Sequence, residues 1–190
     1  MTNEQILQLL PEIEWIGDPD LRQKSLACWK EALELGGWEE KGVRNCPIGV
    51  GLVDDACPER SIDHCRHVVQ VCQAVWENAG EWMRALGPLD HDRLLCSAIL
   101  HDAGKFLEYD VRDGKGCYSE NGRMFRHVIS GAYLAKKHGW PDEIVSNILS
   151  HSDNQSPEGG KRHVTPQLIF LKQVDFLCLS MAQINYPYSV

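Results

Sequence analysis

The chain has 190 residues, an ordinary size for a single domain and long enough to bury a hydrophobic core without disulfide bonds. Its formal net charge of -8 and its pI of about 5.4 argue against nucleic acid polymers and membrane surfaces as partners, but they leave room for a small phosphorylated substrate. The chain shows no basic and apolar leader, no apolar run of about 18 residues and no CxxC pair among its eight cysteines. We therefore expect a cytoplasmic protein with reduced cysteines.

Helix signals dominate the N-terminal part of the chain. Residues Thr2 to Gln5 have the form of a capping box, and Asp18-Pro19 is typical of a helix start. Gly36-Gly37 ends that second helix. From Gly36 to Arg60 the pattern changes to glycine, proline and mixed charges, which indicates a long loop. The loop is either a wall of a pocket or a variable connection.

Two helices with apolar residues at the helical period follow. Ser61 begins the first, which places His64 on or next to its buried face, and Asp90 caps the second. The apolar run of the second helix ends abruptly in His101-Asp102. Burying an imidazole and a carboxylate without partners costs several kcal/mol. The pair must therefore be satisfied by hydrogen bonds, by a salt bridge such as one with Lys105, or by a metal ion.

The C-terminal half continues the helical pattern between two polar loops, at 108–122 and 153–164. One helix carries His127 near its start, the next ends at His151, and Asp175 falls among apolar residues of the last helix. No segment shows a strong alternating β pattern. We expect an all-α, compact helical bundle in which residues 1–60 pack on a core of residues 61–185, with a tail at 186–190.

Six polar residues interrupt the apolar faces of these predicted helices. They are His64, His101, Asp102, His127, His151 and Asp175. Taken singly, each has a simpler interpretation as a hydrogen-bonded core histidine or a salt-bridged aspartate. Together they favour a metal site, because imidazole and carboxylate are ligands that first-row divalent metals choose.

The pattern resembles the HD-domain superfamily of metal-dependent phosphohydrolases. Its signature is a histidine on one helix, an adjacent His-Asp pair on the next, and a distant aspartate on a later helix. Here these are His64, the pair in His101-Asp102-Ala103-Gly104-Lys105, and Asp175. The resemblance covers residues 60–182 and implies the helical HD-type fold. His64 is preferred over His67, which occupies a slot where family members commonly have a basic residue.

His127 and His151 extend the resemblance to the branch of that superfamily with a dinuclear metal site. By this analogy Asp102 is shared between two ions, His64, His101 and Asp175 complete one position, and His127 and His151 complete the other. The resemblance implies one or two divalent ions per chain, with iron or manganese preferred and cobalt, nickel or zinc also compatible with the ligands. Whether the site is mononuclear or dinuclear stays open at this point.

Residues next to the predicted ligands are candidates for catalysis and substrate binding. Asp102, Lys105 and Asp153 are the candidate catalytic residues, with Asp153 as a possible general acid or base. Arg126, Lys105 and Ser152 are the candidate substrate contacts. Lys105 has two open interpretations, since it either pairs with a carboxylate or contacts a substrate anion.

The resemblance implies hydrolysis of a small phosphorylated, nucleotide-like molecule by a metal-activated hydroxide. A diiron oxygenase of the same superfamily is an alternative, although Gln155 stands where those enzymes carry a substrate-binding lysine. A metal-dependent hydrolase of a non-phosphate molecule and a non-catalytic sensor are further alternatives. The expected partner is a small-molecule substrate, without nucleic acid polymer or membrane, and homo-oligomerisation stays open.

Overall fold

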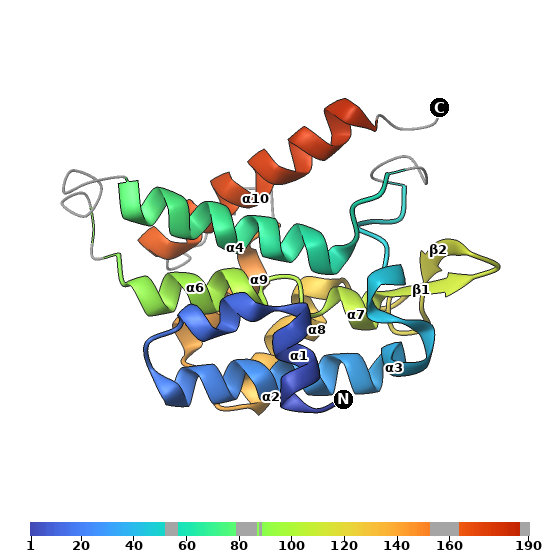
Figure 1. Ribbon diagram of the computed structural model, residues 1–190, viewed down its shortest axis with the longest axis horizontal. Coiled ribbons are helices and arrows are strands. Elements are labelled where there is room, and N and C mark those ends of the chain that lie inside the picture. The colour runs from blue at the N-terminus through green and yellow to red at the C-terminus, as the bar shows by residue number, and fades with distance from the viewer. Residues whose placement is uncertain (52–56, 79–86, 88, 153–163, 187–190) are drawn as a thin grey trace.

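The computed structural model describes residues 1–51, 57–78, 87, 89–152 and 164–186, and this part of the chain is helical apart from one small β-hairpin (Figure 1). The fold is therefore all-α, as the sequence predicts. In chain order the elements are α1 (Asn3–Leu9), the 3-10 helix η1 (Pro11–Trp15), α2 (Pro19–Leu35), α3 (Trp38–Lys41), the 3-10 helix η2 (Val43–Asn45), α4 (Ser61–Asn78), α6 (His91–Leu100), α7 (Lys105–Glu108), β1 (Tyr109–Arg112), β2 (Lys115–Tyr118), α8 (His127–Lys137), α9 (Asp142–Ser150) and α10 (Pro166–Asn185).

The start signals read from the sequence correspond to real helix ends. Thr2 and Gln5 form the predicted capping box, in which each side chain bonds the backbone of the other residue. Asp18 caps α2, and the Asp90 carboxylate accepts a hydrogen bond from the Arg93 backbone nitrogen at 2.8 Å at the start of α6. These local caps fix where the long helices begin.

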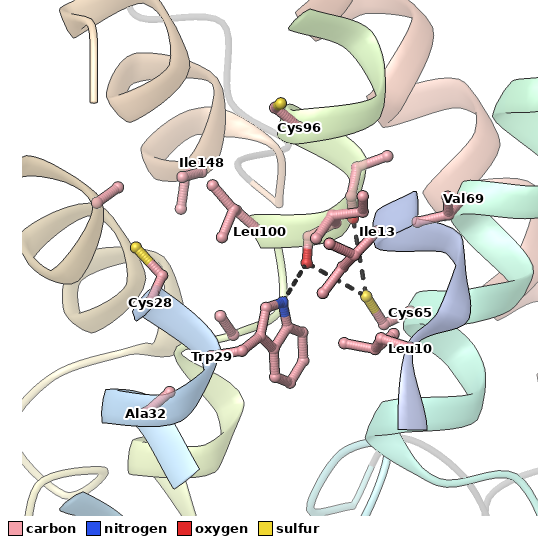
Figure 2. Close-up of a cluster of buried hydrophobic side chains, with 14 of the residues drawn as sticks. Leu10, Ile13, Cys28, Trp29, Ala32, Cys65, Val69, Cys96, Leu100 and Ile148 are labelled. Atoms are coloured by element: carbon pink, nitrogen blue, oxygen red, sulfur yellow. Dashed lines mark hydrogen bonds between the residues drawn. The ribbon is translucent and has the colours of Figure 1, made fainter. Parts of the chain in front are cut away.

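The hydrophobic core lies where α2, α4 and α6 meet, and Figure 2 shows its centre. The Trp29 indole of α2 donates to the backbone carbonyl of Ile99 at 3.0 Å, and the Cys65 thiol of α4 donates to the same carbonyl at 3.5 Å. Ile6 and Ile13 of the N-terminal helices are fully buried in the same cluster. The hydrogen bonds tie α2 and α4 to the end of α6, two residues before His101.

The eight cysteines are free thiols, and six of them are buried. Burial raises the pKa of Cys28 and Cys46 to about 12, so both stay neutral at physiological pH. They act as small hydrophobic residues. None of the described helices combines the length and the hydropathy that a membrane crossing requires.

The structure corrects the prediction of a polar loop at residues 108–122. Most of this segment is an antiparallel hairpin in which Tyr109 pairs with Tyr118 and Arg112 with Lys115. The two residues of its turn, Asp113 and Gly114, have positive φ values of 52° and 75°. An Asp-Gly pair favours that two-residue turn, so the signal was present in the sequence.

The predicted long loop between Gly36 and Arg60 also contains regular structure, in α3 and η2. Trp38 is fully buried, and its indole donates to the Phe106 carbonyl at 2.7 Å while packing edge-on against the Phe106 ring. That anchor explains why the segment folds back on the core. An isolated bridge between Pro47 and Arg60 closes the segment, and residues 52–56 within it lie outside the described residues.

Candidate metal centre

The structure brings the six predicted ligands together from distant parts of the chain. His64 comes from α4, His101 and Asp102 follow α6, His127 begins α8, His151 follows α9, and Asp175 lies in α10. The four histidines and Asp102 are at most 5% exposed, and the Asp175 side chain is 16% exposed. Contacts of α10 with α4, α6 and α9 close this cluster from one side (Figure 1).

Asp102 lies at the middle of the cluster and uses its two carboxylate oxygens differently. Its Oδ2 atom is 3.3 Å from His101 Nε2. Its Oδ1 atom is 3.7 Å from the Nε2 atoms of both His127 and His151. One oxygen of the carboxylate therefore faces the His101 imidazole, and the other faces those of His127 and His151.

Asp175 completes the set on the His101 side. Its Oδ1 atom is 2.9 Å from His64 Nε2 and 3.7 Å from His101 Nε2. On the other side, the Nε2 atoms of His127 and His151 are 3.4 Å apart. The cluster thus consists of a group at His64, His101 and Asp175, and a second group at His127 and His151, with Asp102 between them.

These donors fit divalent cations. Ligand atoms that bind one cation at about 2.1 Å lie roughly 3 to 3.5 Å from one another, which is close to the separations found here. His101 Nε2 is buried and has no hydrogen-bond partner within the described part of the chain. A buried polar atom in that state needs a partner, and nitrogen and oxygen ligands of this kind suit first-row divalent metals.

A second interaction at Nδ1 orients three of the four imidazoles, those of His101, His127 and His151. His101 Nδ1 lies 2.6 Å from the Ala98 carbonyl, and His151 Nδ1 lies 2.7 Å from the Ile148 carbonyl. His127 Nδ1 instead contacts Glu108 Oε2 at 2.6 Å. Because Nδ1 donates a proton outward in each of these, Nε2 faces the centre as the atom that would bind a cation.

The charged side chains of the centre shift the pKa values of one another. Burial by itself would lower the pKa of His101, but the Asp102 carboxylate more than offsets this effect and raises it to about 10. Burial would raise the pKa of Asp102, but the charges of His101 and Lys105 lower it well below its usual range. In the absence of metal, protons and Lys105 therefore neutralise the carboxylates.

Lys105 lies inside the cluster. Its side chain is 8% exposed, and its Nζ atom is 2.8 Å from Asp102 Oδ2. Of the two sequence interpretations, the structure places Lys105 in an ion pair with the carboxylate. This contact fixes the orientation of Asp102 from the side of Oδ2.

Gly104 explains how Asp102 reaches α8. A Cβ atom on Gly104 would lie 2.0 Å from the His127 carbonyl oxygen and 2.7 Å from the Gly131 nitrogen. Only glycine allows the turn after α6 to approach the backbone of α8 so closely. The His-Asp-Ala-Gly-Lys sequence therefore supplies the packing that places Asp102 next to His127 as well as the polar side chains.

The candidate substrate contacts Arg126 and Ser152 lie at the edge of the centre. Arg126 is exposed and directly precedes His127, and its Nη2 atom donates to Ser152 Oγ at 2.9 Å. Asp153, the third candidate catalytic residue, lies outside the described residues. His67 is 55% exposed and contacts Glu59 outside the cluster of six, so only His64 of the two alternatives joins the centre.

Sequence reasoning missed two glutamates that contact the histidines. Glu108 is 4% exposed and touches His127, and Glu59 Oε1 lies 3.4 Å from His64 Nδ1. Neither residue follows a motif: Glu108 is the last residue of α7 and Glu59 precedes α4, and the fold brings each of them next to its histidine. One local signal existed at His127, since Arg126 at the N-cap position is not a residue type that caps helices.

Comparisons with known proteins point to one family. Residues 61–178 match the HD domain family, which covers more than half of the chain. Ribonuclease Y of Pseudothermotoga lettingae is 28% identical over 116 residues, which is 61% of this chain and 18% of that protein. Ribonuclease Y of Desulfotalea psychrophila is 36% identical over 62 residues, which is 33% of this chain and 10% of that protein.

The chain thus spans less than a fifth of the length of these curated relatives. No solved structure gives a significant match. The family match begins at the first residue of α4 and ends three residues after Asp175, so it encloses all six predicted ligands. The chain belongs to the HD domain family, whose members are generally metal-dependent phosphohydrolases that bind divalent metals.

Proposed function

We propose that this protein is a hydrolase that holds two divalent metal ions and cleaves a small phosphorylated, nucleotide-like substrate. The observation that carries this proposal is the position of Asp102, with one oxygen toward His101 and the other toward His127 and His151. That arrangement suits a carboxylate shared between two cations. When bound, such ions supply charge that activates water and polarises a phosphoryl oxygen.

The side chains around the centre have distinct parts in the proposal. Lys105 holds Asp102 in place through their 2.8 Å ion pair. Arg126 lies at the rim beside His127 and offers a guanidinium to a substrate phosphate, with Ser152 as its neighbour. Asp153 is kept as the candidate general acid or base, because it comes directly after Ser152 in the sequence. Iron and manganese remain the preferred metals.

A second candidate substrate is RNA, since both curated relatives are named ribonucleases. Cleavage of an RNA phosphodiester uses the same chemistry at phosphorus, and only the group carried by the phosphate differs. The net charge of -8 favours the small molecule, because a long anionic strand is repelled by an acidic surface.

The proposal is tested by loading the protein with Mn²⁺ or Fe²⁺ and measuring hydrolysis of mononucleotides, dinucleoside polyphosphates and a short RNA. We expect phosphate or nucleotide release from a small substrate that stops with a chelator and is absent from Asp102→Ala. RNA cleavage at higher efficiency would replace the small-molecule assignment. Turnover that consumes dioxygen, or metal-loaded protein that hydrolyses no phosphoester, would contradict the proposal.

A further inference from the structure

The histidines of the centre differ in where they sit on their helices. His101 and His151 lie at the C-terminal ends of α6 and α9, whereas His127 is the first residue of α8 and His64 lies in the first turn of α4. A helix leaves its last four carbonyl groups and its first four N–H groups without partners inside the helix. The two ends therefore offer opposite hydrogen-bonding groups to an imidazole.

At a C-terminal end the free carbonyls accept the Nδ1 proton directly. Both C-terminal histidines use the carbonyl three residues earlier, at 2.6 Å from His101 and 2.7 Å from His151. Their orientation is thus supplied by their own helices, through neutral acceptors.

At an N-terminal end the free groups are donors, so the Nδ1 proton needs an acceptor from elsewhere. For His127 that acceptor is Glu108 at the end of α7, which is nineteen positions earlier in the chain. Its Oε2 atom lies 2.6 Å from the His127 ring Nδ1 and 2.6 Å from the His127 backbone nitrogen. One carboxylate oxygen therefore orients the imidazole and caps α8, where Arg126 makes no side-chain cap within the described structure.

For His64 the nearest carboxylate is that of Glu59, but His64 Nδ1 makes no hydrogen bond to it or to any other described residue. Glu59 Oε1 is 3.4 Å from His64 Nδ1 and is shared with the exposed His67 at 3.0 Å. The Glu59 side chain is also more exposed than that of Glu108, at 17% against 6%. Of the two carboxylates, only Glu108 makes a hydrogen bond with the Nδ1 atom of its histidine.

We propose that Glu108 is a positioning residue that sets the affinity of the metal position formed by Asp102, His127 and His151, and that it does so separately from the other position. A carboxylate acceptor fixes the ring and makes Nε2 a stronger ligand than a neutral carbonyl does. This inference rests on the metal binding in the proposed function. It makes the position at His127 adjustable by a residue outside the ligand set.

The test compares Mn²⁺ binding by the wild type, Glu108→Gln, Glu59→Gln and the exposed control Glu120→Gln, using equilibrium dialysis and the spin coupling of bound Mn²⁺. Glutamine keeps the size of the side chain and one carbonyl oxygen, so the cap of α8 is retained while the charge is lost. We expect Glu108→Gln to weaken one of two Mn²⁺ positions about 10- to 100-fold and to lose the spin-coupled signal. Glu59→Gln should have a smaller effect on the other position, and the control none.

Three results would overturn the inference. Glu108→Gln could bind two Mn²⁺ with wild-type affinity, or it could weaken both positions equally while lowering the melting temperature of the metal-free protein, which is the result for a purely structural cap. A wild type that binds only one Mn²⁺ at any concentration would also overturn it. The readout is independent of turnover, so two bound Mn²⁺ without phosphoester hydrolysis would refute the proposed function and leave this inference standing.

Discussion

The part of the apolar core around Trp29 and the candidate metal centre are built on the same helices but differ in how their polar atoms are satisfied. Cys65 of α4 faces the core, where its thiol and the Trp29 indole both reach the Ile99 carbonyl (Figure 2). The preceding residue, His64, faces the centre. The core pairs these atoms within the chain, whereas His101 Nε2 in the centre has no hydrogen-bond partner among the described residues.

The two regions therefore support different properties: the core stabilises the fold, and the centre is suited to metal binding. Burying the apolar residues around Trp29 stabilises the fold without any ligand. The centre gathers imidazoles and carboxylates, and in the absence of metal the charges of His101 and Lys105 balance the Asp102 carboxylate, so a cation would take the place of these charges. Changes in one region should therefore leave the property of the other region intact, and each variant below tests that separation.

The largest expected effect is that of Asp102→Ala. Both metal positions lose the carboxylate that lies between them, so we expect loss of metal binding and a fall in hydrolysis of about 10³-fold or more. Metal analysis and phosphate release measure these losses, and circular dichroism checks that the helices persist. Wild-type turnover in this variant would refute the assignment of the site.

Trp29→Ala should have the reverse effect of Asp102→Ala, because it should lower the stability of the fold and leave metal binding unchanged. Removing a fully buried indole and its bond to Ile99 is expected to cost about 3–5 kcal/mol in the free energy of unfolding. Urea denaturation measures this cost. At a temperature where the variant is still folded, its metal content should equal that of the wild type, and a selective loss of metal would show that the two regions are not separate.

His127→Ala distinguishes the two halves of the centre. The variant should lose one metal equivalent and keep the other, because His64, His101 and Asp175 remain in place. Metal analysis of dialysed protein gives the stoichiometry. Retention of both equivalents would exclude the dinuclear arrangement.

The smallest effect is a graded dependence of metal binding on pH. A cation must displace the proton of His101, whose pKa is raised from 6.5 to about 10 in the metal-free chain. Apparent affinity should therefore rise about tenfold for each pH unit between pH 7 and pH 9. Titration calorimetry in buffers of different ionisation enthalpy measures the released proton, and a flat affinity with no proton release would contradict this account.

The raised pKa of His101 also makes the stability of the metal-free protein depend on pH, in the opposite direction to metal affinity. A histidine with a raised folded-state pKa contributes stability that is fully present below pH 6.5 and is lost as the pH approaches 10. Metal-free protein should therefore become less stable across that interval, while metal-loaded protein should not.

The sequence predicts the helical fold well, because caps such as Thr2, Asp18 and Asp90 act locally. It also identifies the six residues that meet in the centre, since each interrupts an apolar helical face. The hairpin at Asp113-Gly114 was missed because its strands are short and largely polar, although its turn signal is local.

Other features depend on how distant segments pack and leave no pattern in the sequence. Glu108 reaches His127 only because α7 lies against α8, and Gly104 matters because of backbone atoms 27 positions away at Gly131. Trp38 likewise finds its acceptor at Phe106. Local periodicity identifies the six candidate ligands, whereas the residues that orient them emerge only from the folded chain.

The central claim is that this polar cluster holds two divalent metal ions. It is tested most directly by the metal content of wild-type protein purified anaerobically without chelator and then titrated with Mn²⁺ or Fe²⁺. The account predicts two equivalents per chain. Saturation at one equivalent would contradict the dinuclear site, and failure to bind either metal would contradict the metal centre itself.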